Sequence, residues 1–386
     1  MQQRAVRFAI SVLLAVVAFV SHPAPAQALP TWARKYDLAC SECHSAWPTL
    51  NSFGRDFKAN GYRLREEVEG DEEFVQAVVD FLKLDRGFPI AARGVMRPYD
   101  KRKDRAASIR SFHEVEVYFA GRVFDNVSAF FEIEAEDEVE FNVFVESGTM
   151  TWSPLPEANL SLGWAPVFWN DPFATLADGG HRMTRSHKGP LDQRFAARER
   201  LRSSSQWLGF FGRAADNRVF YMGGVSAGGD DPEGNDAKDG YGRAMVTAVS
   251  GVYVGGYVLA GTNQTQGVDQ SFHRAGFDFQ IEKRGLTVYG TLMHTKDDLV
   301  AGGDETHTLG YVEGFYIFPM RAIHSIVPLL RIDLLSDVND RTDLTFNLNF
   351  YVVENIKTYF EWWQNIESPS GTDNDWRATW QIDFSF

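Results

Sequence analysis

The residues best suited to chemistry are the two cysteines of the chain, which stand beside a histidine in Cys40-Ser41-Glu42-Cys43-His44. Thiols separated by two residues lie about one helical turn apart, a spacing at which both can bond the vinyl groups of one haem. The adjacent imidazole then supplies the proximal iron ligand. The motif therefore predicts one covalent haem c per chain, bound by Cys40, Cys43 and His44.

Other uses of the two cysteines fit the sequence less well. A thioredoxin-like redox pair has the same spacing but belongs to a βαβ unit, which the surrounding sequence does not predict. A structural disulfide between Cys40 and Cys43 stays open as an alternative. A zinc site would need further Cys or His ligands nearby, and residues 45–89 contain neither.

The first 28 residues have the pattern of a secretory signal peptide. Arg4 and Arg7 precede the apolar run 8–20, and Ala26-Gln27-Ala28 offers a small-residue cleavage site. The apolar run is too short for a spanning helix. We expect export and a mature chain that begins near Leu29, which suits haem attachment outside the cytoplasm.

The chain is acidic, with a formal net charge of −14 at pH 7, and loss of the two signal-peptide arginines makes it −16. This balance argues against nucleic acid as a partner and favours cationic partners. One predicted loop concentrates carboxylates that would attract cations or bind structural divalent ions. They are Asp230, Asp231, Glu233, Asp236 and Asp239.

Apolar residues at helical spacing follow the haem motif and predict a helix that covers the haem. Pro48 suits its first turn, and Asn60-Gly61 suits its C-terminal end. The apolar face consists of Trp47, Leu50, Phe53, Gly54 and Phe57. We assign Trp47, Phe53 and Gly54 to the haem contact, although ordinary core packing explains the same pattern.

Residues 29–87 form the predicted cytochrome c domain, with a second helix over 71–84. So short a domain buries little apolar surface by itself. We therefore expect the rest of the chain to help enclose it.

Residues 88–386 predict an all-β transmembrane barrel. Apolar residues alternate with polar ones in the last segment from Trp376 to Phe386, as in a strand with one lipid-facing side. A soluble β-sandwich is the alternative. We count about sixteen antiparallel strands, beginning near residues 88, 109, 127, 142, 158, 206, 217, 241, 254, 271, 285, 305, 322, 342, 356 and 375.

With an even number of strands, the start of the first strand and the end of the last strand lie on the same side of the membrane. If the N-terminal domain is periplasmic, the short connections are periplasmic and the longer polar ones are extracellular. The third extracellular loop, residues 166–205, is a candidate for a constriction loop that folds into the lumen.

Alternation also predicts which charged side chains line the lumen. Val115, Val117 and Phe119 should face lipid. The inward set should contain Glu114, Glu116, Glu132, Glu134 and Glu146 on one wall, with Arg93 and Arg97 on the first strand.

A sixth haem ligand must come from outside the cytochrome domain, because no Met or His occurs between His44 and Met96. Alternation places Met150 and Met222 on inward registers, so we predict these two as candidates. The same reasoning turns Met96 and His113 toward lipid. Met183, His181 or His187 would reach the haem only if the third loop descends deep into the lumen, and water or no ligand are further alternatives.

The N-terminal region resembles the fused monohaem cytochrome and porin family of the outer membrane, known from iron-oxidising bacteria. The resemblance spans about residues 29–64, and the barrel matches only in architecture. Trp32 and Lys35 depart from the pattern. The matching residues are Leu29 to Arg34, the haem motif, Trp47 to Leu50, Phe53 to Lys58, and Gly61-Tyr62.

The resemblance implies an oxidoreductase of the outer membrane of a Gram-negative bacterium. It would oxidise extracellular Fe(II) and pass the electron through one haem c to a periplasmic c-type cytochrome. Chains that end in a strand with a C-terminal aromatic, here Phe386, resemble outer-membrane barrels in which that residue belongs to the signal read by the barrel assembly machinery. Outward electron delivery and a porin with a haem-bearing plug or sensor domain are the alternatives.

Overall fold

The structure, a computed structural model, describes most of the chain after residue 30. The predicted signal peptide and the predicted helix over 71–84 lie outside the described residues. The described residues are 31–36, 38–64, 90–124, 126–155, 157–176, 182–197, 200–227, 238–265, 267–335, 341–367 and 374–385.

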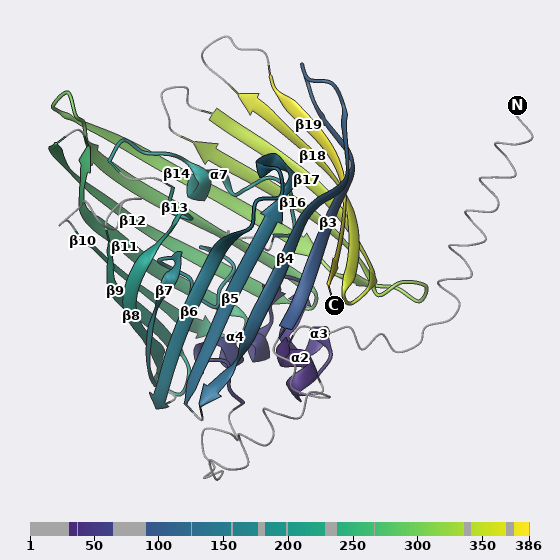
Figure 1. The fold of residues 1–386 in the computed structure, drawn as a ribbon, viewed down its shortest axis with the longest axis horizontal. Helices are drawn as coiled ribbons and strands as arrows, with labels where there is room; N and C mark the ends of the chain where they lie inside the picture. The colour runs from purple at the N-terminus through teal and green to yellow at the C-terminus, as the bar shows by residue number, and fades with distance from the viewer. Residues whose placement is uncertain are drawn as a thin grey trace, which may run out of the picture.

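One antiparallel sheet closes into a barrel, because the last strand, β19, pairs with the first barrel strand, β3 (Figure 1). A two-residue strand, β15 (Phe318–Pro319), precedes β16. The long strands are β3 (Ile90–Arg102), β4 (Ser108–Phe124), β5 (Val127–Glu136), β6 (Phe144–Leu155), β7 (Ala158–Pro166), β8 (Ser204–Ala214), β9 (Val219–Ala227), β10 (Lys238–Val249), β11 (Val252–Thr265), β12 (Val268–Lys283), β13 (Leu286–Asp298), β14 (Asp304–Tyr316), β16 (Ser325–Leu335), β17 (Arg341–Val353), β18 (Ile356–Glu367) and β19 (Trp376–Ser385).

The barrel prediction is confirmed. The described part of the chain contains sixteen long barrel strands, and each begins within three residues of its predicted start. The sandwich alternative is wrong because the sheet closes on itself. Predicted loops were too long in places, since β3 extends to Arg102 and β11 to Thr265.

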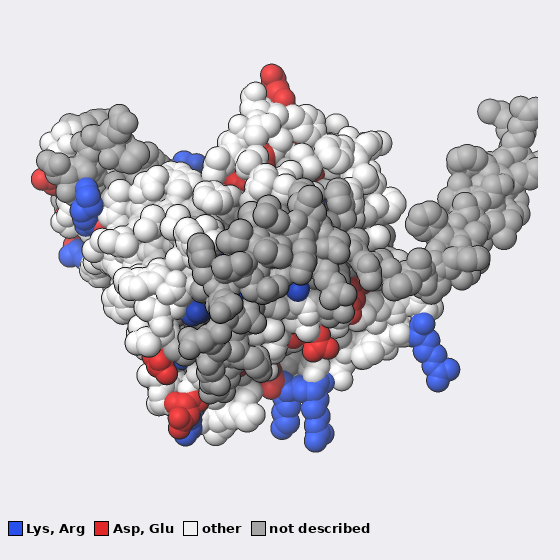
Figure 2. Space-filling view, turned by 60° about the horizontal axis from the view of Figure 1, so that its bottom comes forward, with Lys and Arg blue, Asp and Glu red and all other residues white. Residues whose placement is uncertain are grey.

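Along the strands, polar side chains that face the lumen alternate with apolar side chains on the outer face, as a membrane barrel requires. In β17, Thr345 and Asn347 are 0% exposed, whereas Phe346 between them is 47% exposed. A closed ladder pairs the backbone groups that lipid cannot hydrogen-bond. Figure 2 shows an outer wall that is white over most of its visible area, with charged side chains mostly near the edges of the outline. No helix in the described residues is long and apolar enough to cross a membrane.

The two barrel ends differ in their connections. We call the end that joins β4 to β5, β10 to β11, β12 to β13 and β17 to β18 by tight turns the short-turn end. The opposite end, the long-loop end, carries the 37-residue connection between β7 and β8, residues 167–203. This difference agrees with the predicted division into short and long connections.

The N-terminal segment folds into short elements at the short-turn end, below β3 to β5 in Figure 1. They are α2 (Thr31–Tyr36), α3 (Cys40–Cys43), β1 (His44–Ala46), β2 (Thr49–Leu50) and α4 (Ser52–Ala59). Trp32 stacks on Tyr62 with ring centroids 5.4 Å apart, and Phe57 meets both rings edge-on.

The helix predicted to start near Pro48 begins only at Ser52. Asn51 caps it, because the Asn51 side chain accepts a hydrogen bond from the Gly54 amide at 2.9 Å. Trp47 and Pro48 instead join β1 to β2. The predicted stop is confirmed, since Asn60 is the C-cap and Gly61 has a φ of +69°.

The loop between β7 and β8 folds into the lumen, as predicted for a constriction loop. It contains one helical turn, α7 (Gly189–Asp192). Phe168 packs edge-on against Tyr241 of β10 and Tyr257 of β11. Five large apolar side chains of the loop are at most 6% exposed, namely Phe168, Phe173, Leu176, Leu191 and Leu201. The loop and the barrel wall therefore share one apolar core.

Candidate functional site

Cys40 and Cys43 lie on the single turn of α3, and both are free thiols. Burial raises the pKa of each to about 11, helped by the carboxylates of Glu354 for Cys40 and Glu42 for Cys43. Reactive redox cysteines have lowered pKa values instead. The pair therefore lacks the electrostatics of a thioredoxin-like site, and both thiols are on one helical turn, as the haem prediction expects.

His44 is held in the tautomer that a haem ligand needs. Its Nδ1 lies 3.1 Å from the carbonyl oxygen of Pro48. A carbonyl only accepts, so Nδ1 carries the proton and Nε2 carries the lone pair. Such a hydrogen bond orients a ligating imidazole and raises its basicity.

The helix α4 is tied to the haem motif through Asn51 and Gly54. Besides capping α4, Asn51 donates to the carbonyl oxygens of Ser41 and Glu42 at 3.1 and 2.9 Å. A Cβ on Gly54 would lie 2.1 Å from the Cys43 carbonyl oxygen. Gly54 is thus the close-approach point of the two segments, while Phe53 is 40% exposed.

The haem motif docks on the barrel at the turn between β17 and β18. Glu354 in that turn accepts hydrogen bonds from the Cys40 amide and the Ser41 hydroxyl, at 2.8 and 2.7 Å. Tyr351 donates to the Trp47 carbonyl oxygen at 2.6 Å.

Trp47 points its ring at two lumen cations. The Lys357 Nζ lies 4.5 Å and the Arg93 Cζ 5.4 Å from the ring centroid. The Arg93 guanidinium also donates to Glu116 at 2.6 Å and to Glu114 at 3.0 Å. Trp47, three residues after His44, is therefore one side chain away from the carboxylates of the lumen wall.

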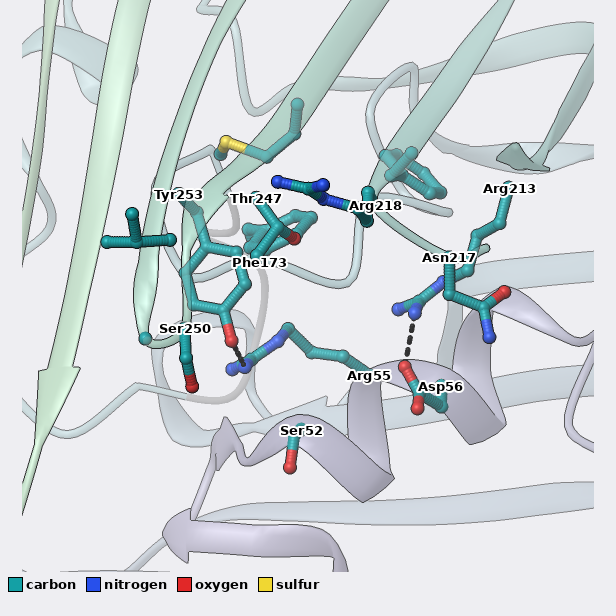
Figure 3. A pocket seen from close by; sticks show the side chains of 14 residues that line it. Ser52, Arg55, Asp56, Phe173, Arg213, Asn217, Arg218, Thr247, Ser250 and Tyr253 are labelled. Atoms are coloured by element: carbon teal, nitrogen blue, oxygen red, sulfur yellow. Dashed lines mark hydrogen bonds and ion pairs between the residues drawn. The ribbon is translucent and has the colours of Figure 1, made fainter. Parts of the chain in front are cut away.

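Helix α4 is anchored by ion pairs, of which Figure 3 shows the one between Asp56 and Arg213. Arg55, which is 2% exposed, donates to both carboxylate oxygens of Glu282 at 2.5 and 2.9 Å and to the Tyr253 hydroxyl at 2.9 Å. Asp56 pairs with Arg213 of β8. These side chains line a cavity of about 400 Å³ at the short-turn end.

Lys58 connects α4 to the lumen loop. Its ammonium donates to the Asp171 carbonyl oxygen at 3.0 Å. Burial lowers the pKa of Lys58 to about 8 and raises that of Asp171 to about 6. The N-terminal segment thus contacts both the barrel wall and the loop inside it.

The acidic lumen wall is confirmed. Glu116, Glu132 and Glu134 are 0%, 2% and 9% exposed, and Glu114 and Arg93 contact each other beside them. Arg97 is also inward, and its Nε donates to Gln381 at 2.8 Å.

The two predicted distal haem ligands lie on different faces of the barrel wall. Met150 is 45% exposed on the outer face, so its inward assignment is wrong. The pairing of β5 with β6 skips Glu146, and this bulge reverses the alternation after it. Met222 is inward, as predicted, and 4% exposed; it packs in the lumen core, paired in register with Phe211 and Arg243.

Met183, in the lumen loop, is a methionine that contacts the N-terminal segment. The Thr49 hydroxyl donates to its sulfur at 3.7 Å, and Met183 is 4% exposed. His187 contacts Arg182, and His181 lies outside the described residues. Sequence reasoning named Met183 only on the condition that the loop descends, which it does.

The acidic loop and His113 also need correction. Asp239 is 1% exposed on β10 rather than in a loop, and the other four carboxylates of that cluster lie outside the described residues. His113, predicted to face lipid, is 1% exposed and bonds Asp137.

Comparison with solved structures places the barrel among porin folds. An anion-selective porin from Comamonas acidovorans matches with a TM-score of 0.54 at 11% identity, over 77% of this chain and 99% of that chain. OmpF of Salmonella typhi, solved with daunomycin, gives 0.57 at 10% identity over 77% and 97%. The DcaP channel of Acinetobacter baumannii gives 0.53 at 8% identity over 77% and 97%. No family model and no curated protein matches the chain.

The chain therefore has the fold of an outer-membrane porin barrel. It differs from an open channel in that the described loop and the N-terminal segment occupy its lumen and its short-turn end.

Proposed function

We propose that this protein is an electron conduit of the Gram-negative outer membrane. It accepts single electrons from extracellular Fe(II) and passes them to a periplasmic c-type cytochrome. One haem c, bound by Cys40, Cys43 and His44, would supply the one-electron carrier. The supporting observation is that the haem motif docks on the barrel with Trp47 one side chain away from the acidic lumen wall.

The chain's own residues have separate tasks in this proposal. Cys40 and Cys43 hold the carrier in place, and the Pro48 carbonyl fixes the orientation of His44. Glu354 anchors the motif to the barrel. The lumen carboxylates raise the local concentration of the cationic donor.

The direction of insertion follows from the connections. Short turns are periplasmic and longer loops extracellular in bacterial outer-membrane barrels. The haem motif lies at the short-turn end, so a periplasmic acceptor can reach it directly. The donor approaches from the long-loop end, where its oxidised, poorly soluble product stays outside the cell.

A porin with a haem-bearing plug is the second candidate, favoured by the likeness to porins. The filled lumen supports electron transfer over solute flow. The described loop buries Phe168, Phe173 and Leu191 in one cluster with side chains of the barrel wall, which leaves them out of water.

The proposal is tested with purified full-length protein in detergent. A pyridine haemochrome assay should give one haem per polypeptide, and anaerobic Fe(II) should reduce that haem. Cys40→Ala and Cys43→Ala together should abolish both signals. Stoichiometric haem that Fe(II) leaves oxidised would contradict Fe(II) as donor and leave the plug or sensor as the better account.

A further inference from the structure

We propose that His113, Glu114 and Glu136, with Glu134 beside them, form a binding site for a first-row divalent metal ion inside the barrel. One ligand atom from each of His113, Glu114 and Glu136 lies within 4.8 Å of the others. The site is near the long-loop end, because His113 is close to the start of β4 and Glu136 ends β5. It lies far along the strands from the turn that joins β4 to β5 at the short-turn end.

A bulge brings two neighbouring ligands to one face. The pairing of β3 with β4 shifts between Val95 and Arg97, opposite Glu114 and Arg110. An extra residue in one strand lets consecutive side chains share a face. His113 is therefore 1% exposed although Glu114, its neighbour, also points into the lumen with a side chain 14% exposed.

His113 is oriented as a metal ligand. Its Nδ1 lies 2.7 Å from the Asp137 carboxylate and 3.3 Å from the Arg110 guanidinium, and the shorter contact to an acceptor favours the tautomer with the proton on Nδ1. Nε2 then carries the lone pair and lies 3.8 Å from a Glu114 oxygen. A carboxylate behind a histidine is the usual second partner of a ligating imidazole. Arg110 also contacts Asp137 and Glu138, and neutralises that outer pair.

The carboxylates deeper in the cluster lack such a cation. Glu134 is 9% exposed, and no hydrogen-bond donor or cation contacts its carboxylate among the described residues. Glu134 stands directly opposite Glu116 in the ladder, and Glu114 stands opposite Glu136. Like charges at directly opposed positions destabilise a sheet. Arg93 contacts Glu114 and Glu116, so among the described residues Glu134 is the carboxylate left to a bound cation.

The donor set indicates the class of metal. Carboxylates suit hard divalent ions, and an imidazole shifts the preference toward Fe, Mn, Co, Ni or Zn rather than Ca²⁺ or Mg²⁺. Water completes the coordination of such an open site.

The identity of the natural ion as Fe(II) rests on the proposed function. In that case one electron leaves Fe(II), which becomes Fe(III), and the haem c accepts it. Glu114 contacts Arg93, and the Arg93 guanidinium lies over the ring of Trp47, so one guanidinium lies between the metal site and a side chain three residues after His44.

The test uses Mn(II) as a probe that undergoes no redox reaction here. Mn(II) is titrated into the full-length, haem-loaded protein in detergent, and the electron paramagnetic resonance signal of free Mn(II) is measured. We expect one bound ion in the wild type. His113→Gln and Glu136→Gln should weaken its affinity about tenfold or more, and Asp137→Asn should weaken it by about 10–100-fold, as loss of an outer partner does.

The matched control is His307→Gln. His307 lies 3.7 Å from Glu305 at the same barrel end, but no third ligand among the described residues joins this pair. Its substitution should leave Mn(II) affinity unchanged. If His113→Gln fails to fold, Glu136→Gln decides the question.

Equal Mn(II) affinity in the wild type and Glu136→Gln, or several weak sites insensitive to both substitutions, would overturn the site. Mn(II) binding without haem reduction by Fe(II) would support the site and contradict the proposed function. Haem reduction by Fe(II) at the same rate in His113→Gln would support the proposed function and overturn the role of this site in it.

Discussion

At Gly54 a missing side chain decides whether α4 can lie against the haem motif. The nearest atoms to a Cβ at this position would be backbone atoms of Cys43, which cannot rotate away. The helical pattern pointed to Gly54 as a haem-contact residue, and the structure adds that Gly54 packs closely against the backbone of Cys43. Backbone contacts of this kind come from the fold and leave little trace in the spacing of apolar residues.

Gly54→Ala should destabilise the N-terminal segment by about 1–3 kcal/mol, the usual effect of forcing an extra methyl group into a packed site. Haem incorporation, measured by haem-staining electrophoresis, should fall accordingly. Gly240→Ala is the control, because a Cβ there meets nothing within 4 Å. Unchanged haem content and unchanged protease resistance in Gly54→Ala would contradict this packing role.

We propose Met183 as the distal ligand in place of Met150 and Met222, because its sulfur contacts Thr49, five residues after His44. We expect Met183→Ala to remove the methionine-to-iron charge-transfer band and lower the midpoint potential, because Met ligation raises it. Met150→Ala should leave the spectrum unchanged, since Met150 is on the outer face. A band that survives in Met183→Ala would refute the assignment.

At the scale of elements, the strands were predictable and their irregularities were not. Period-two alternation located every long strand to within three residues, because a lipid-facing side must be apolar. Alternation then failed at His113 and Met150, where bulges in β4 and β6 change the face. A bulge depends on the pairing of two strands, so one strand's sequence does not reveal it.

The docking of α4 was also beyond sequence reasoning. Arg55 and Glu282 lie 227 residues apart in the sequence, and nothing local pairs them. The sequence predicted only that the barrel would help to enclose the short N-terminal domain. It did not predict which residues would make the contact.

Arg55→Ala should destabilise the docked segment by about 3 kcal/mol, because it leaves Glu282 without its partner. This value is at the low end for a buried pair, since the Glu282 side chain keeps 21% exposure. Limited proteolysis of the folded barrel should release the N-terminal segment faster. Arg55→Gln with Glu282→Gln should restore much of the resistance, and equal cleavage rates in all variants would argue against this anchor.

At the scale of the whole molecule, this barrel has the fold of a porin, but protein segments fill its lumen. The loop between β7 and β8 and the N-terminal segment occupy space that water fills in an open porin. In the proposed conduit, the barrel would supply the passage through the membrane and the haem motif would hold the electron carrier.

Conductance separates the conduit from a solute channel. In a planar bilayer, the wild-type protein should show single-channel conductance well below that of an open porin of similar strand number. Deletion of residues 177–197 should raise the conductance, because it removes most of the lumen loop between described strands β7 and β8. A wild-type conductance equal to that of an open porin would contradict the filled lumen and favour a solute channel.

The most direct test of the central claim is electron transfer across a membrane. The protein is inserted into liposomes that enclose an oxidised soluble cytochrome c, with the short-turn end inside, and Fe(II) is added outside under anaerobic conditions. The enclosed cytochrome should be reduced with the wild type and not with the Cys40→Ala and Cys43→Ala variant. Reduction at the same rate without the two cysteines, or no reduction through a haem-loaded wild type, would contradict the account.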